Sequence, residues 1–286
     1  MPTYQASDGA VLHYDERGTG RPLVAIAGGA ARDPIYLGDL GGIGEGRRLI
    51  VPHLRGVGSS AAPTDPAVGS WWNQASDLEA LRIHLGEDHI DVIAHSAGTR
   101  LATSYAARYG DRVSRMMLVT PPSQHLVDVA SDVVEIARRR SADATFEAAV
   151  ALLQSGPPLT NETEFNEWQR AIAPAGYAHW GEDAQRHSHL GSWDLRAATS
   201  FFSVAPPADF VDRLRQCTAS VLVIAGADDA LTGLAPVVAL SRLFPNGKVE
   251  VLADCGHYPW IEQPERFTAA VVEFLREPIS VKARQR

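Results

Sequence analysis

The sequence has few of the residues that build disulfide scaffolds or metal centres. Its 286 residues include two cysteines, Cys217 and Cys255, too few for a disulfide framework. Cys255 precedes His257 by two positions, but no second Cys/His cluster has the spacing of metal ligands. We therefore expect neither a metal site nor a cofactor.

Basic segments and long apolar segments are also scarce. The 34 Asp and Glu residues outnumber the 26 Lys and Arg residues, and the net charge of -8 argues against a nucleic-acid-binding surface. The basic run at 138–140 is typical of a solvated helix face. Residues 1–5 lack the pattern of a signal peptide, and no apolar run approaches the ~20 residues that span a bilayer. We expect a cytoplasmic protein that binds neither nucleic acid nor membranes.

One serine stands at an abrupt change of pattern. The run 91–95 ends at Ser96, which has Ala94, Ala97 and Gly98 as small neighbours, and an Ala/Leu-rich helical stretch follows at once. A strand, a serine, a tight turn and a helix together are typical of a nucleophile elbow. Because a serine hydroxyl is a weak nucleophile at neutral pH, this interpretation requires a base and an orienting acid elsewhere.

Candidates for the acid and the base follow two later apolar runs. Asp228 and Asp229 come after the run 220–226, and His257 comes shortly after the run 248–252. We prefer Asp229 because it lies three residues after Gly226, as in the pattern Gly-x-x-Asp. Parallel strands present their carboxyl ends at one edge of a sheet, where sites are built. The joint order predicts a triad in which His257 takes the proton of Ser96 and Asp229 orients the imidazole.

Acyl transfer also needs two donors directed at the developing oxyanion. The backbone N–H of Ala97, directly after the serine, is the first candidate. The turn Gly28-Gly29 follows the buried-type run 23–27 and offers the backbone N–H of Gly29 as the second. A glycine pair can simply turn the chain, but beside a nucleophile at Ser96 it favours an oxyanion hole.

Alternating strand and helix patterns predict an α/β fold. Residues 3–15 indicate an antiparallel hairpin. Apolar residues have helical spacing at 71–85 and 264–276. Further strand-like runs lie at 23–27, 48–52, 91–94, 115–120, 220–226 and 248–252. Such alternation implies a mostly parallel sheet with helices on both faces. Between 121 and about 207 the pattern is helical only. We therefore predict a core of 1–120 and 209–286, with residues 121–208 inserted as a helical lid, or cap, domain.

These features resemble the α/β-hydrolase superfamily over nearly the whole chain, and the sequence is most similar to its proline iminopeptidase family. The segment 27–30, Ala-Gly-Gly-Ala, stands where that family has His-Gly-Gly-Pro. The segment 55–59 matches the family's Arg-Gly-x-Gly-x, and 72–82 resembles the helix before the nucleophile strand. The Arg-Gly-x-Gly pattern also occurs in esterases and related hydrolases.

Four positions depart from that family. Ala27 and Ala30 replace its His and Pro, Ala94 replaces the first glycine of the elbow, and Ala97 stands where the peptidases commonly carry Trp. Because the oxyanion donors are backbone groups, these departures bear on the substrate more than on the catalytic machinery.

The resemblance implies an aminopeptidase that cleaves an aminoacyl group from a small peptide or amide through an acyl-enzyme. Family members bind the substrate's α-ammonium group with lid carboxylates. The predicted lid offers acidic candidates, of which no single one is favoured: Glu135, Glu147, Glu162, Glu164, Glu167, Glu182, Asp183 and Asp194. Its aromatic residues could line an apolar pocket or hold the lid to the core.

Three alternatives remain open at this point. The same triad would serve a carboxylesterase or lactonase, the fold could serve as a small-molecule sensor with little turnover, and the amide could belong to a small natural product. In each case the expected partner is a small molecule or short peptide. The oligomeric state is left open.

Overall fold

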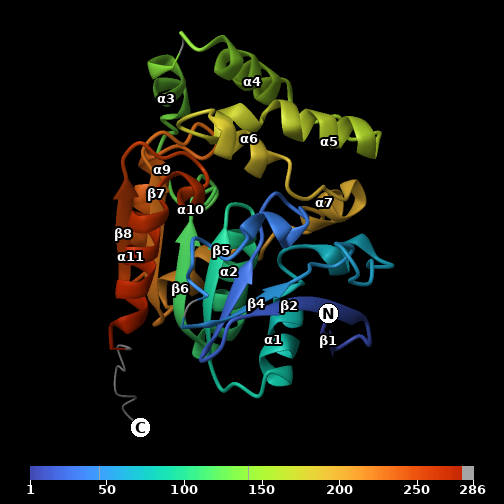
Figure 1. The fold of residues 1–286 in the computed structure, drawn as a ribbon. Helices are drawn as coiled ribbons and strands as arrows, with labels where there is room; N and C mark the ends of the chain where they lie inside the picture. The colour runs from blue at the N-terminus through green and yellow to red at the C-terminus, as the bar shows by residue number, and fades with distance from the viewer. Residues whose placement is uncertain (45, 141, 279–286) are drawn as a thin grey trace.

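An eight-stranded mixed sheet forms the centre of the molecule (Figure 1). The computed structural model describes residues 1–44, 46–140 and 142–278. The strand order is β1-β2-β4-β3-β5-β6-β7-β8. The bounds are β1 (Thr3–Gln5), β2 (Val11–Arg17), β3 (Pro22–Ile26), β4 (Arg48–Pro52), β5 (Ile90–His95), β6 (Val113–Val119), β7 (Ser220–Gly226) and β8 (Gly247–Leu252).

Among the eight described strands, only β2 runs opposite to the others. β1 pairs antiparallel with β2, and β2 pairs antiparallel with β4, whereas every pair from β4 to β8 is parallel. This arrangement confirms the predicted hairpin at the N-terminus and the mostly parallel sheet. The central strands are buried along their whole length, which is why they read as continuous apolar runs.

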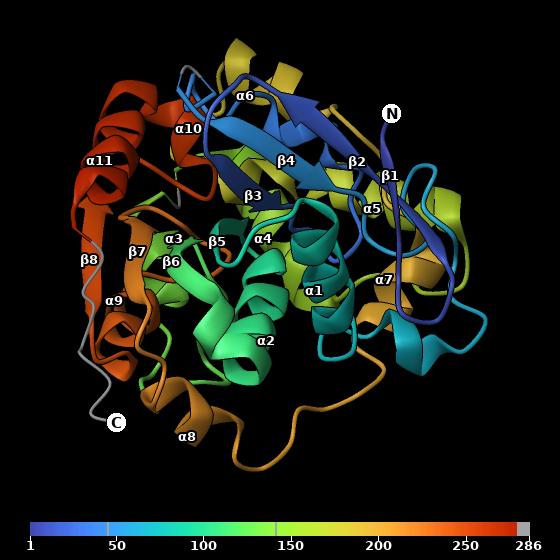
Figure 2. The same ribbon diagram turned by 90° about the horizontal axis from the view of Figure 1, so that it is seen from below.

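Helices cover both faces of the sheet (Figure 2). One face packs against α1 (Ala75–His84), α2 (Gly98–Tyr109), α8 (Phe210–Arg215) and α9 (Ala235–Leu240), and the other against α11 (Pro264–Arg276). Because side chains alternate along a strand, Val24 and Ile26 of β3 join the first core while Leu23 and Ala25 join the second. Among the described residues, no helix has the length and apolar character to cross a membrane.

Residues 121–208, which we call the cap segment, contain five α-helices among their described residues. They are α3 (Val133–Arg139), α4 (Ala144–Ser155), α5 (Glu162–Ala171), α6 (Glu182–Ser188) and α7 (Leu195–Phe201). Figure 1 shows α3 to α6 gathered above the end of the sheet toward which the arrows of β6, β7 and β8 point. The helical pattern of the sequence indicated α3 to α5 but did not indicate α6 and α7.

At the opposite end of the sheet, a buried carboxylate anchors the strand that leads to Ser96. Asp91 is fully buried, and its Oδ2 lies 3.1 Å from Arg47, 3.5 Å from Arg115 and 3.6 Å from Arg21. Arg115 is itself buried, so Asp91 balances a guanidinium that water does not reach. This ion cluster stabilises the fold at a place remote from the strand ends under the cap segment.

We predict that Asp91→Asn lowers the free energy of unfolding by about 3 kcal/mol, because removing one partner leaves a buried charge uncompensated. Urea unfolding followed by circular dichroism measures the change. Asp212→Asn serves as a control, since its pair with Arg215 is exposed and contributes little. Equal stability of the Asp91 variant and the wild type would contradict the prediction, and turnover per folded molecule should stay unchanged.

Candidate active site

Ser96 occupies a strained turn between β5 and α2. Its φ of 49° lies in the left-handed region, which residues with a Cβ rarely adopt. The backbone is held there by two hydrogen bonds, from Ser96 N–H to the Val119 carbonyl at 2.9 Å and from Thr99 N–H to the Ser96 carbonyl at 2.9 Å. The serine is therefore presented beyond the end of β5, as the sequence pattern predicts for an elbow.

Two glycines make this turn possible. A Cβ on Gly98 would lie 2.4 Å from the Ala27 carbonyl oxygen, so α2 can begin against β3 only without a side chain there. A Cβ on Gly28 would lie 2.6 Å from the His95 carbonyl oxygen and 2.8 Å from Ser96 Cβ. The Gly28-Gly29 turn thus packs directly against the serine.

His257 and Asp229 are joined by a buried hydrogen bond. His257 Nδ1 lies 2.8 Å from Asp229 Oδ2, and the two residues are 3% and 1% exposed. A carboxylate accepts, so Nδ1 carries the proton and Nε2 is the free ring nitrogen. The pair has the geometry of the acid and base of a serine hydrolase.

Further donors stabilise the ionised form of Asp229. Its oxygens accept hydrogen bonds from the backbone N–H groups of Leu231 and Thr232 and from the Thr232 hydroxyl. Burial alone would raise the pKa of Asp229, but His257 and these donors hold the pKa below its ordinary value. Asp228, the alternative acid, instead lies 3.5 Å from Arg139 and is partly exposed.

The residue that precedes Ser96 contacts His257. The ring centroid of His95 lies 4.7 Å from that of His257, and His95 Nε2 lies 2.9 Å from the His257 carbonyl oxygen. In the described part of the chain, Ser96 Oγ makes no hydrogen bond to His257. Such bonds are often formed only once substrate is bound.

Among the described residues, neither predicted oxyanion donor has a hydrogen-bond partner. Gly29 has a φ of 67°, and Ala97 precedes the first residue of α2. Within 1–44, 46–140 and 142–278, no acceptor is hydrogen-bonded to the backbone N–H of either residue. Both groups are therefore available to a ligand beside Ser96.

Arg32 ties the cap segment to the turn that carries Gly29. Its side chain is 2% exposed, and it donates to the carbonyl groups of His187, Ser188 and Leu190 at the end of α6. The guanidinium also lies 4.3 Å from the ring centroid of Tyr36 and 4.4 Å from that of Trp193. No carboxylate among the described residues forms an ion pair with Arg32. The helix end supplies the compensating partial negative charge.

The eight acidic candidates of the cap segment lie elsewhere. Seven of the eight are exposed, and the eighth, Asp194, caps α7 by accepting from the Ala197 N–H. Glu182 and Asp183 both pair with Arg186. None of the eight forms a hydrogen bond or ion pair with Ser96, His257 or the Gly28-Gly29 turn in the described structure. Several cap aromatic residues are buried instead, including Phe165, Tyr177, Trp193 and Phe201.

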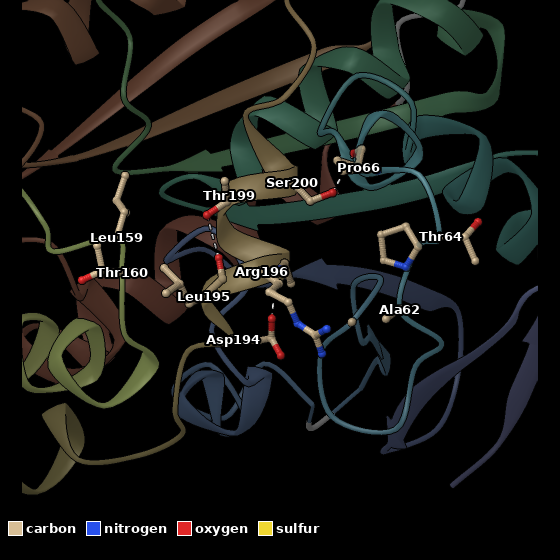
Figure 3. A pocket seen from close by; sticks show the side chains of 13 residues that line it. Ala62, Thr64, Pro66, Leu159, Thr160, Asp194, Leu195, Arg196, Thr199 and Ser200 are labelled. Atoms are coloured by element: carbon tan, nitrogen blue, oxygen red, sulfur yellow. Dashed lines mark hydrogen bonds between the residues drawn. The ribbon is translucent and has the colours of Figure 1, made fainter.

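A cavity of about 480 Å³ opens between α7 and the loop that follows β4 (Figure 3). Asp194, Leu195 and Arg196 at the start of α7 line it, together with Pro63 and Pro66 of the loop. Ser96, Asp229 and His257 do not line this cavity. It is therefore separate from the place where the predicted site residues gather.

Sequence reasoning did not identify several residues that surround the triad. Tyr36, Arg32 and Thr120 carry no local motif, and only the position of His95 beside Ser96 could have drawn attention to it. For metals, the described residues contain no group of three or more His, Cys, Asp or Glu side chains able to hold an ion.

Comparison with known proteins establishes the family. A family profile for the alpha/beta hydrolase fold matches residues 34–264. This match covers most of the chain, so the protein belongs to the α/β-hydrolase family and is a hydrolase. The similarity to proline iminopeptidases inferred from the motifs is confirmed by the relatives described next.

The relatives have the names of different kinds of hydrolase. The chain is 25% identical over 279 residues to the proline iminopeptidase of Heyndrickxia coagulans, covering 92% of this chain and 93% of that protein. It is 27% identical over 270 residues to a 2-hydroxymuconate semialdehyde hydrolase of Pseudomonas putida, covering 92% and 89%. A solved thermophilic esterase of Thermogutta terrifontis is 25% identical, with a TM-score of 0.67 over 96% of this chain and 97% of that one.

We predict that Gly29→Ala lowers turnover by about 10²-fold, because the turn and its free N–H must move. A Cβ there would lie 2.6 Å from Trp193 Nε1 and 2.8 Å from Arg32 Cβ, at a φ of 67°. Gly86→Ala is the matched control, since Gly86 has a φ of 71° with nothing within 4 Å of its Cβ position. Steady-state kinetics of both variants separate the steric effect of the new Cβ on Trp193 and Arg32 from the cost of a left-handed backbone at alanine. Equal turnover in the two variants would contradict the prediction.

Proposed function

We propose that the protein is a serine hydrolase that cleaves a small acyl substrate with Ser96 as nucleophile, His257 as base and Asp229 as orienting acid. The observation that carries the proposal is the buried hydrogen bond of 2.8 Å between His257 Nδ1 and Asp229 Oδ2 beside the strained serine turn. It leaves Nε2 as the acceptor for the hydroxyl proton.

The reaction follows from these positions. Ser96 Oγ attacks the substrate carbonyl carbon while its proton passes to His257 Nε2, and Asp229 stabilises the resulting imidazolium. The N–H groups of Gly29 and Ala97 hold the oxyanion. His257 then protonates the leaving group, and a water molecule activated by the same nitrogen hydrolyses the acyl-enzyme. In this proposal the cap segment acts as a lid that excludes other water.

The charge around the site favours an ester over an aminoacyl amide as substrate. An aminopeptidase must bind an α-ammonium group, and the cap carboxylates are exposed or engaged elsewhere, whereas the buried charge beside the oxyanion turn is the cation Arg32. We therefore propose a carboxylesterase or lactonase acting on a small neutral or anionic ester. Aminopeptidase activity is the second candidate, and the similarity to proline iminopeptidases favours it.

We predict that Ser96→Ala lowers turnover by about 10⁴-fold or more while the fold persists, because no other hydroxyl is positioned to form the acyl-enzyme. Release of p-nitrophenol from p-nitrophenyl acetate measures turnover, and circular dichroism reports folding. Ser104→Ala is the control, since Ser104 is buried in α2 and donates only to the Arg100 carbonyl. Appreciable turnover by folded Ser96→Ala would refute the assignment.

We predict that kcat/KM for p-nitrophenyl acetate exceeds that for alanyl- and prolyl-β-naphthylamide by at least about 100-fold, since an unpaired buried ammonium group costs about 3 kcal/mol. The panel includes N-acetylated versions of both amides. Faster cleavage of the free-amine amides, lost on N-acetylation, would establish the aminopeptidase instead.

A further inference from the structure

Tyr36 and His95 form a buried hydrogen-bond chain that the reaction steps above do not use. The Gly28 N–H lies 2.6 Å from the Tyr36 hydroxyl oxygen, which lies 2.8 Å from His95 Nδ1. On the other side of the ring, His95 Nε2 lies 2.9 Å from the His257 carbonyl oxygen. Tyr36 is 1% exposed and His95 is 3% exposed, so no water competes for these bonds.

The three bonds have one consistent direction. A carbonyl oxygen can only accept, so His95 Nε2 carries a proton and donates to His257. Burial, with His257 close by, holds the pKa of His95 well below its ordinary value and keeps the ring neutral. His95 Nδ1 must then accept the proton of the Tyr36 hydroxyl, whose oxygen accepts the Gly28 N–H. Every donor and acceptor in the chain is satisfied.

The chain joins three segments that are distant in sequence. Gly28 directly precedes the proposed oxyanion donor Gly29 at the end of β3, and His95 directly precedes Ser96 at the end of β5. His257 follows β8, and its carbonyl also accepts from the Thr120 hydroxyl at 3.0 Å. The link therefore runs between the main chains of the proposed oxyanion turn, nucleophile and base.

Aromatic neighbours hold the linking ring in place. The His95 ring packs edge-on against Trp260, with centroids 4.8 Å apart and planes at 87°, and lies 5.2 Å from the Tyr258 ring. A ring rotation would break two hydrogen bonds and collide with these neighbours. The connection is consequently rigid.

We propose that Tyr36 and His95 are positioning residues that hold the oxyanion turn, the nucleophile elbow and the histidine loop in register. This inference rests on the proposed function, because it assumes that Ser96, Gly29 and His257 perform the chemistry. Neither side chain needs to touch the substrate: Tyr36 acts through Gly28, and His95 acts through the His257 main chain. Displacement of a catalytic group by 1 Å can lower the rate by about 10²-fold, so such a link has a measurable role.

The first test is Tyr36→Phe, which keeps the packed ring and removes only the hydroxyl. Gly28 N–H and His95 Nδ1 lose their partner, so we expect kcat to fall by about 10-fold to 100-fold while KM stays within about twofold. Tyr14→Phe is the matched control, because Tyr14 on β2 is buried and its hydroxyl lies 3.3 Å from Nε2 of His84 on α1, outside the site. Equal kcat in the two variants would overturn the proposal.

A second pair of variants separates hydrogen bonding from packing. The amide of His95→Gln can donate to the His257 carbonyl and accept from Tyr36, whereas His95→Leu only fills the space. We expect the Gln variant to retain at least about tenfold more kcat than the Leu variant, in line with the loss of one oriented contact. Similar kcat in both variants would show that ring volume alone matters and would overturn the proposal.

Nitrogen-15 NMR of the wild-type imidazoles tests the chain without any substitution. The proposal requires His95 to be the neutral Nε2–H tautomer at neutral pH, and an Nδ1–H tautomer or a charged ring would overturn it. Turnover of folded Ser96→Ala distinguishes a failure of the proposed function from a failure of the positioning role. Retained turnover there rejects the proposed function, whereas an inactive Ser96→Ala beside a fully active Tyr36→Phe rejects only the positioning role.

Discussion

The close approach of two backbone turns at one end of the sheet is the constraint on which the structure depends. β3 and β5 are adjacent and parallel, so the turns that follow them meet, and neither turn tolerates a Cβ at the contact. Gly28 and Gly98 have no Cβ at this contact, and Ser96 has a left-handed backbone conformation. Because the positions are set by main chain against main chain, the geometry survives wide variation in the surrounding side chains.

The cap segment is hydrogen-bonded to the turns and loops that follow the core strands. Arg32 leaves the oxyanion turn, stacks between two aromatic rings and satisfies carbonyl groups at the end of α6. His257 N–H donates to the Gly176 carbonyl at 2.7 Å, so the histidine loop is attached to the cap segment as well. Glu262 strengthens the same junction by accepting from the N–H groups of Gly256 and Ala178. Opening the cap would therefore disturb the reacting groups directly.

The chain is similar to relatives whose names describe an iminopeptidase, a semialdehyde hydrolase and an esterase. Under the proposed function, Ser96, His257 and the backbone donors follow core strands, and the cap segment lies over the ends of those strands. In this chain the cap segment binds Arg32, the buried cation beside the Gly28-Gly29 turn, and its eight acidic candidates are exposed or engaged in a helix cap. Under the proposed function, the cap segment sets the choice of substrate, whereas the reaction steps take place at the strand ends.

The sequence alone determined the alternation of strands and helices, the serine turn and the order of Ser96, Asp229 and His257, because those signals are local runs and short spacings. It also separated Asp229 from Asp228 by a three-residue spacing, and the hydrogen bond to His257 agrees with that choice. Only the tertiary structure decided that Tyr36, Arg32 and Glu262 surround the site, and that the cap carboxylates do not. Tyr36 meets His95 across 59 residues, and Arg32 meets Leu190 across 158. A one-dimensional pattern carries no record of which distant side chains meet.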